Sequence, residues 1–224
     1  MDLEIQEVSE LLNVPMETLL QWAGEGKIPS YTIQERYRFN REEIEDWVMQ
    51  QKLLESFDGM QHSKKGGQLT FNLFRALHKG EVFSDIHGSN KQLIIKETMN
   101  RLAPKLKLDP DVITEIIMER EELMPTALGA GFGIPHARDF LLKGQNDIVA
   151  CVFLTEPIEY GALDGMPVHT LFLLLASDDK RHLSLLAKIA HLIANPEMRK
   201  VLSRKPNKTE LLELIQNWEA NLKV

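Results

Sequence analysis

A chain of 224 residues is long enough to bury one large core or two smaller ones, and 43% apolar and 26% charged residues are ordinary for a globular protein. No segment has the pattern of a signal peptide, and the longest apolar run, 171–176, is far too short to cross a membrane, so we expect a soluble cytoplasmic protein without membrane insertion. The single cysteine, Cys151, excludes an intrachain disulfide and a thiolate-rich metal site.

The net charge of −7 is concentrated at the N-terminus. Residues 1–56 carry 5 Lys and Arg against 12 Asp and Glu, whereas residues 57–224 carry 21 of each kind. A polar stretch with three glycines and no apolar periodicity, 56–68, separates the two parts, as a flexible linker does. We therefore predict one domain over 1–55, a linker over 56–68 and a second domain over 69–224.

The first domain has the pattern of a winged helix-turn-helix. An apolar stripe predicts a helix over 5–12, and a second helix ends at Gly24. The β-prone segments 31–33 and 36–39 predict a short hairpin. A capping box, Asn40-Arg41-Glu42-Glu43, then predicts the start of a third helix.

This pattern resembles the DNA-binding domains of the excisionase and MerR type over about residues 1–50. The segments that carry the resemblance are Val8 to Val14, Trp22 with Glu25 to Pro29, and Arg36 to Phe39 with Ile44 and Trp47. In that family the exposed face of the second helix is rich in Arg and Ser, but here it carries Met16, Glu17, Thr18, Gln21, Gly24 and Glu25.

Few residues of this domain are candidates for DNA contact. They are Thr18, Gln21, Lys27, Arg36 and Arg38. DNA binding draws much of its affinity from neutralised phosphates, so an acidic domain is at a disadvantage. DNA is therefore a possible but disfavoured partner, and a protein partner is the alternative.

The second domain alternates helices with apolar strands. Helices are predicted over 69–79, 90–102, 109–121, 178–194 and 209–219, and strands over 148–154 and 168–176. The strands are almost continuously apolar, which predicts helices on both faces of a sheet. The fold class is α/β. His169 is expected to be a core histidine, and Asp164 is expected to shape a turn with Gly165.

Short motifs exclude the common nucleotide and hydrolase sites. The chain has no Walker loop, no G-x-S-x-G elbow and no H-E-x-x-H helix, and Ile134 stands where a dinucleotide fingerprint needs glycine. No two histidines lie three or four residues apart. We therefore predict neither a metal site nor a cofactor.

The most informative segment is Gly133-Ile134-Pro135-His136-Ala137-Arg138. Glycines at 129, 131 and 133 allow the backbone to approach a ligand closely, and Pro135 restricts the backbone just before the imidazole. From this local pattern alone, His136 can be a nucleophile, a base, a metal ligand or a hydrogen-bonded turn histidine.

An ordered set of motifs around His136 resembles the enzyme IIA domains of the phosphotransferase system, of the fructose, mannitol and nitrogen-regulatory type, over residues 71–220. Its most specific pieces are Arg120-Glu121, Thr126 to His136, Asp164 to Val168 and His182 to Ala187. The resemblance implies a mixed sheet flanked by helices. It also implies that His136 accepts a phosphoryl group from a histidine phosphocarrier protein, with His182 and Arg120 stabilising the phosphate.

The chemistry of these positions agrees with the implied roles. An imidazole with a pKa of ~6.5 offers a nucleophilic nitrogen near pH 7, and phosphoryl transfer needs mostly positioning and charge stabilisation. His182 falls in the first turn of its predicted helix, where a phosphate is favoured. The backbone amides of Gly131, Phe132 and Gly133 are predicted to bind phosphate, and Arg138 is predicted to bind phosphate or an acidic partner.

The sequence thus predicts a regulatory IIA-type phosphocarrier that is phosphorylated on His136 and signals through its helix-turn-helix to an unknown downstream partner. Three alternatives stay open: a DNA-binding transcriptional regulator with a IIA-like sensor domain, the IIA component of a sugar uptake system, and a IIA scaffold that is not phosphorylated. No IIB-like cysteine domain or membrane segment follows in this chain, which favours a regulator.

Overall fold

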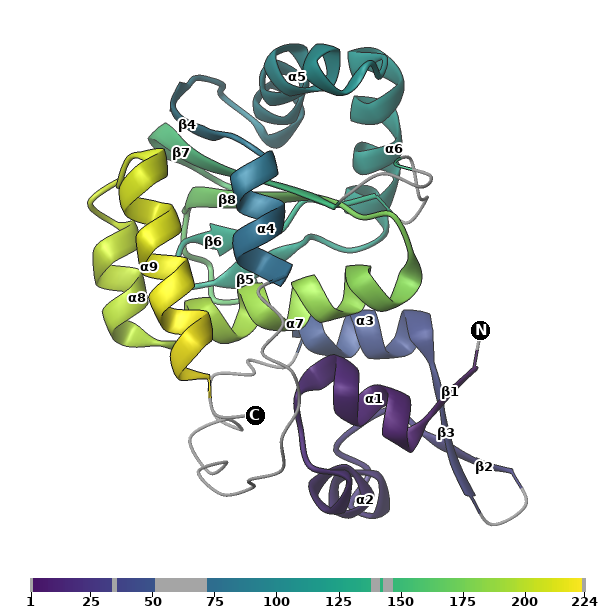
Figure 1. The fold of residues 1–224 in the computed structure, drawn as a ribbon. Helices are drawn as coiled ribbons and strands as arrows, with labels where there is room; N and C mark the ends of the chain where they lie inside the picture. Colours follow the sequence, from purple (N-terminus) through teal and green to yellow (C-terminus); the bar gives the residue numbers. More distant parts are fainter. Residues whose placement is uncertain (1, 34–35, 51–71, 138–141, 143–146, 223–224) are drawn as a thin grey trace.

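The computed structural model describes residues 2–33, 36–50, 72–137, 142 and 147–222. These residues form a small N-terminal unit and a larger α/β unit, which are in contact (Figure 1). The predicted linker, 56–68, lies outside the described residues, so the predicted domain boundaries stay predictions.

The N-terminal unit combines a helix-turn-helix with a three-stranded sheet. Its elements are β1 (Asp2–Glu4), α1 (Ile5–Leu12), α2 (Met16–Gly24), β2 (Tyr31–Ile33), β3 (Arg36–Asn40) and α3 (Arg41–Gln50). β3 lies between β1 and β2 and is antiparallel to both. Asn40 accepts a hydrogen bond from the Glu43 amide, so the predicted cap of α3 is present.

The N-terminal unit packs its helices around two tryptophans. The rings of Trp22 and Trp47 lie 5.8 Å apart, and the Trp47 indole N–H donates to the Lys27 carbonyl. The buried apolar side chains around them come from β1, α1, α2, β3 and α3. This core continues into the second unit, because Leu183, Ala187 and Ala190 belong to the same cluster.

The α/β unit is built on a five-stranded sheet in the order β4-β7-β8-β6-β5. Its elements are α4 (Asn72–Lys79), β4 (Val82–Ile86), α5 (Lys91–Leu102), the 3-10 helix η2 (Ala103–Leu106), α6 (Pro110–Leu123), β5 (Ala127–Gly129), β6 (Phe132–Gly133), β7 (Ile148–Ile158), β8 (Val168–Leu175), α7 (Asp179–Ala194), α8 (Pro196–Leu202) and α9 (Lys208–Asn221). The pairs β4/β7 and β6/β8 are parallel and the others antiparallel, which confirms a mixed sheet.

Helices cover both faces of this sheet, as its apolar strands predicted. One face packs against α4, α7 and α9, and the other packs against α5 and α6 (Figure 1). The caps at Asn90, Asp109 and Asp178 each accept backbone amides at the starts of α5, α6 and α7. Within the described part of the chain, no helix is long and apolar enough to cross a membrane.

Candidate functional site

Backbone pairing on two sides holds the segment that carries His136. The Ile134 amide donates to the Thr126 carbonyl at 2.9 Å, and the Leu174 amide donates to the Pro135 carbonyl at 3.0 Å. His136 itself forms a parallel bridge with Leu174 of β8. Its side chain is fully buried, at 0% exposure. The imidazole is therefore anchored to the central sheet rather than to a loose loop.

The backbone also decides which ring nitrogen of His136 can react. Nδ1 lies 2.6 Å from the Ile134 carbonyl oxygen. A carbonyl oxygen only accepts hydrogen bonds, so Nδ1 must carry the proton. The lone pair of the neutral ring is then on Nε2, which is the nucleophilic nitrogen.

The fold brings His182 beside His136. His182 lies in the first turn of α7, and its amide donates to the carbonyl of Asp178, the N-cap residue. The two imidazole rings lie 5.0 Å apart between centroids, and both side chains are fully buried. His182 thus lies at the N-terminal end of α7, where the helix dipole favours negative charge.

A residue of the N-terminal unit completes this cluster. Arg41, the first residue of α3, has Nη2 at 2.9 Å from Nδ1 of His182 and Nε at 3.5 Å from Asp179 Oδ1. A guanidinium only donates, so Nδ1 of His182 accepts and the proton of its neutral ring is on Nε2. Arg41 is not among the residues predicted for the site. The one feature of the sequence that marks Arg41 is its charge: it is a cation at the start of a predicted helix, where the helix dipole favours acidic side chains.

Arg120 and its neighbour Glu121 support the strand that leads into the site. Both are buried at the end of α6, and Nη1 of Arg120 donates to the Met124 carbonyl at 3.1 Å. Glu121 accepts hydrogen bonds from the amide and hydroxyl of Thr126 and from Lys91 Nζ. The Thr126 carbonyl accepts a hydrogen bond from Ile134, two residues before His136. Glu121 therefore holds in place the backbone that supports the His136 segment.

The glycine-rich turn forms the hairpin between β5 and β6. β6 lies between β5 and β8 and pairs with both. The role of the Gly131, Phe132 and Gly133 amides in binding phosphate stays a prediction. Gly131, with φ +84, sits at the tip of the β5–β6 hairpin, where an added Cβ would lie 2.4 Å from the His169 ring.

Two further predictions meet at this hairpin tip. Asp164 accepts from the amides of Ala130 and Met166, at 2.7 and 3.1 Å, so its turn-shaping role is confirmed. His169 is only half-buried and packs edge-on against Phe132, with ring centroids 4.9 Å apart. The expectation of a core histidine at this position is wrong, because its ring lies in a surface groove beside the hairpin.

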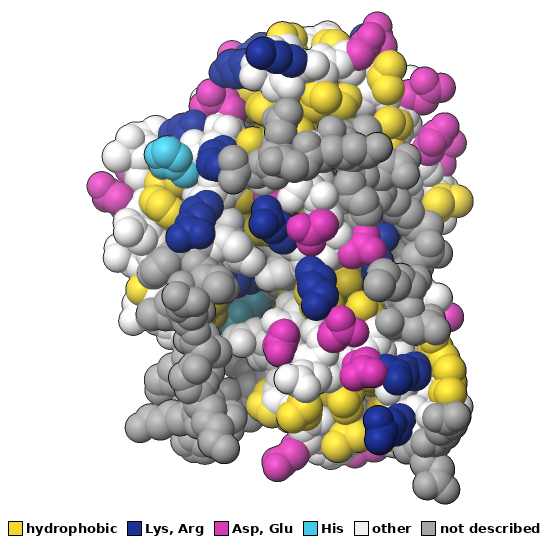
Figure 2. Space-filling view, turned by 45° about the vertical axis from the view of Figure 1, so that its right-hand side comes forward, with side chains coloured by type: hydrophobic (Ala, Val, Ile, Leu, Met, Phe, Trp, Pro, Cys, Tyr) yellow, Lys and Arg dark blue, Asp and Glu magenta, His cyan; other side chains and the backbone are white. Residues whose placement is uncertain are grey.

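The candidates for DNA contact are close to acids of their own unit. Glu25 pairs with Lys27 and accepts from Gln21, and Glu4 pairs with Arg38. Arg36 is exposed and Thr18 half-buried. On the face in Figure 2, acidic side chains likewise lie among the basic ones. Arg138, the remaining candidate, lies outside the described residues.

The described residues contain no group of three or more His, Cys, Asp or Glu that could hold a metal ion.

Comparisons with known proteins agree with this architecture. The description "Phosphoenolpyruvate-dependent sugar phosphotransferase system, EIIA 2" matches residues 75–218, and "Helix-turn-helix domain" matches residues 3–52. The nitrogen regulatory protein of Pseudomonas aeruginosa is 33% identical over 147 residues, which are 64% of this chain and 94% of that protein.

Solved structures show the same fold for the α/β unit. Nitrogen regulatory protein IIA-Ntr from Neisseria meningitidis has a TM-score of 0.55 and 27% identity, covering 60% of this chain and 92% of that one. IIA mannitol from Escherichia coli, at 18% identity, shares the fold with a TM-score of 0.51 over 60% of this chain and 95% of that one. With a helix-turn-helix domain at its N-terminus, the chain belongs to the EIIA 2 family of the phosphoenolpyruvate-dependent sugar phosphotransferase system.

Proposed function

We propose that the chain is a regulatory phosphocarrier in which Nε2 of His136 accepts a phosphoryl group from a histidine phosphocarrier protein. The observation that carries this proposal is the 2.6 Å contact between Nδ1 of His136 and the Ile134 carbonyl. It leaves one imidazole nitrogen with a lone pair at a fixed position, which is what a nucleophile for phosphoryl transfer needs.

The transfer itself is balanced without moving a proton. The lone pair on Nε2 of His136 attacks phosphorus in line with the bond to the donor imidazole. The phosphorus–nitrogen bond to His136 forms as the bond to the donor breaks, and the donor nitrogen keeps that bond's electron pair. The proton on Nδ1 stays hydrogen-bonded to the Ile134 carbonyl.

The neighbours of His136 can stabilise the charge on the three phosphoryl oxygens. His182 lies 5.0 Å away between ring centroids, and the proton on its Nε2 can be donated to a phosphoryl oxygen. Arg120 is buried at the end of α6, and we propose that its guanidinium supplies positive charge at the phosphate. We assign His182 and Arg120 to phosphate stabilisation on these grounds.

The regulatory part of the proposal rests on the N-terminal domain and on the named relatives. The relative from Pseudomonas aeruginosa and the structure from Neisseria meningitidis are both nitrogen regulatory proteins. A helix-turn-helix domain joined to the IIA domain gives a phosphorylation signal a route to a second partner. We propose a protein as that partner, because the candidate DNA contacts are paired with acids.

The test is phosphorylation of the full chain with phosphoenolpyruvate, enzyme I and the histidine phosphocarrier. The wild type is expected to gain one acid-labile phosphate, and His136→Ala is expected to gain none. His87→Ala, which removes an exposed histidine from another part of the surface, is the matched control and keeps full labelling. A wild type without label, or a fully labelled His136→Ala variant, would exclude the proposal. Passage of the phosphate to a IIB domain would instead support the sugar-uptake alternative.

A further inference from the structure

The N-terminal unit is docked on the helix that carries His182. Helices α1 and α3 both contact α7, as Figure 1 shows below the sheet. Leu183, Ala187 and Ala190 line the face of α7 that packs into the core of the N-terminal unit. The docking face therefore begins one residue after His182.

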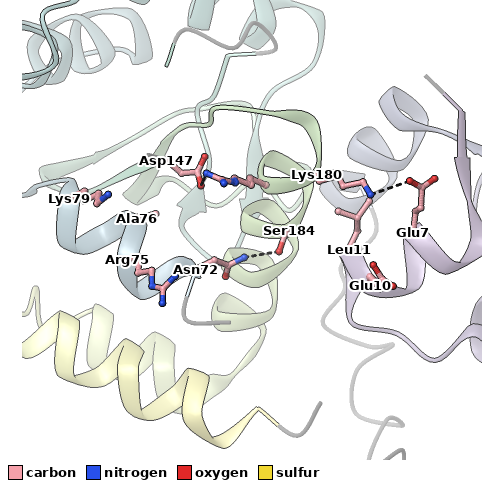
Figure 3. Close-up of a pocket in the computed structure, with 11 residues that line it drawn as sticks. Glu7, Glu10, Leu11, Asn72, Arg75, Ala76, Lys79, Asp147, Lys180 and Ser184 are labelled. Atoms are coloured by element: carbon pink, nitrogen blue, oxygen red, sulfur yellow. Dashed lines mark hydrogen bonds and ion pairs between the residues drawn. The ribbon is translucent and has the colours of Figure 1, made fainter. Parts of the chain in front are cut away.

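Polar contacts hold the two units together around the same point. Arg41 of α3 reaches His182 and Asp179, and Glu7 of α1 pairs with Lys180 at 3.3 Å (Figure 3). All of these partners on α7 belong to its first turn. The N-terminal unit thus covers the helix end that the site uses.

In this docked arrangement a second protein has no access to the acceptor. The side chains of His136 and His182 have 0% exposure. Transfer from another protein's imidazole requires phosphorus between two nitrogens in line, so the acceptor nitrogen must be reachable from outside. Burial of both rings is incompatible with that geometry.

The interface has the character of one that can open. Two of the three residues that α7 contributes to the shared apolar cluster are alanines, and ion pairs and the Arg41–His182 hydrogen bond lie beside this cluster. Next to the interface lies an open cleft of about 440 Å³ between α1, α4 and α7 (Figure 3). Interfaces between the domains of one chain commonly permit relative motion.

We propose that the N-terminal unit is an occluding cap that competes with the phosphocarrier for the first turn of α7, so that His136 is phosphorylated only when the two units separate. Arg41 is the residue that joins the cap to the site. The proposal rests on the proposed function. The observed rate of phosphorylation then equals the rate of the open form multiplied by the fraction of open molecules.

The first test locks the cap in place. Glu7→Cys and Lys180→Cys put thiols where an ion pair now bridges α1 and α7, and a short bismaleimide joins them in the full chain. Cys151 does not interfere, because it is fully buried and burial raises the pKa of its thiol above the usual range. The cross-linked protein is expected to be phosphorylated at about one tenth of the rate of the same variant without cross-linker, or at a still lower rate.

The controls separate this proposal from the proposed function. The Glu7→Cys variant capped with a monofunctional maleimide is expected to be phosphorylated like the Glu7→Cys variant without maleimide. Equal rates with and without the cross-link would overturn the cap while leaving the phosphocarrier function intact. No phosphorylation of any sample would overturn the proposed function, and the cap with it.

The second test weakens the cap at Arg41. Arg41→Ala removes the contacts to His182 and Asp179 and is expected to accelerate phosphorylation of the full chain by about three- to tenfold, since the open fraction rises. Arg41→Lys is expected to give a smaller acceleration. Arg38→Ala, which removes an arginine paired within the N-terminal unit, is the matched control and leaves the rate unchanged. A slower Arg41→Ala variant would mean that Arg41 serves the phosphate directly, and would overturn the cap.

Discussion

The backbone around His136 fixes the tautomer and the position of its imidazole. Nδ1 faces the Ile134 carbonyl, and the backbone of His136 is bridged to Leu174 of β8. In the proposed function, an imidazole that is oriented before the phosphoryl donor binds reduces the entropic cost of transfer.

Glu121 is the buried acid on which this arrangement depends most directly. Glu121→Ala would leave the amide and hydroxyl of Thr126 and the Lys91 ammonium without their acceptor. We expect a loss of about 3 kcal/mol in the free energy of unfolding, measured by urea titration. Glu122→Ala, at the adjacent exposed position, should change it by less than about 0.5 kcal/mol. Equal small effects in both variants would contradict this role.

His191 of α7 should make stability depend on pH. Burial lowers the pKa of His191 below its usual 6.5, so the folded state binds a proton less readily than the unfolded state. Stability is therefore unaffected by this group above that value and falls as the pH drops below it. Between about pH 7.5 and about pH 5.5, His191→Gln should lose less unfolding free energy than the wild type. Parallel losses in the two proteins would argue against this contribution.

Among the helices, α9 connects its neighbours through one carboxylate. Glu219 of α9 accepts from the amides of Leu73 and Phe74 at the start of α4, at 3.2 and 2.9 Å. It also pairs with Lys188 of α7 at 2.6 Å. The carboxylate of α9 thus accepts from amides in the first turn of α4 that have no partner within that helix. Its ion pair with Lys188 connects α9 to α7.

Removing that carboxylate should destabilise the α/β unit as a whole. Glu219→Ala removes the acceptor of the Leu73 and Phe74 amides and of the Lys188 ammonium, which costs about 3 kcal/mol and lowers the melting temperature by about 6–12 °C. Glu213→Ala removes an exposed acid from the same helix and should shift it by no more than about 2 °C. The comparison is made by calorimetry; a Glu219→Ala protein that melts with the control would refute the connecting role.

The longer elements could be predicted because their signals are local. Asn90, Asp109 and Asp178 are cap residues ahead of apolar periodicity, and the strands β7 and β8 are continuous apolar runs. The missed elements β1, β4, β5 and β6 have two to five residues each, so neighbouring strands rather than their own sequences define them. Helix α8 was not predicted, although the sequence contains a helix-start signal, the N-cap Asn195 followed by Pro196.

The site was predictable only in part, for a related reason. The order of motifs selected His136, and the fold brings His182 next to it. Arg41 could not be predicted as a site residue, because it lies 141 residues before His182 in the sequence and in the other unit. The phosphate role of the Gly131, Phe132 and Gly133 amides stays a prediction, because glycine spacing alone does not say which amides a sheet uses.

The two units also differ in which surfaces they leave open. Docking uses α1 and α3, while α2 and the β2–β3 hairpin lie on the far side from α7 (Figure 1). Met16 and Leu20 on α2 and Ile33 on β2 are exposed large apolar side chains. The elements with which a helix-turn-helix contacts its target are therefore free in the capped state, and their chemistry is acidic and apolar rather than basic.

From this charge pattern we expect DNA binding by the full chain to be weak. All of the net charge of −7 lies in residues 1–56, and Glu25 pairs with Lys27 and accepts from Gln21. We expect a dissociation constant above about 10 μM for duplex DNA in 150 mM salt, measured by fluorescence anisotropy.

Neutralising α2 should shift that result in a defined direction. Glu25→Gln releases Lys27, so binding at low salt should strengthen and the plot of log K against log salt should steepen by about one. Glu10→Gln removes the same charge from α1, beside the cleft and away from α2, and should leave the slope unchanged. Tight wild-type binding that weakens steeply with salt would instead make DNA the target of this domain, because only neutralised phosphates produce that dependence.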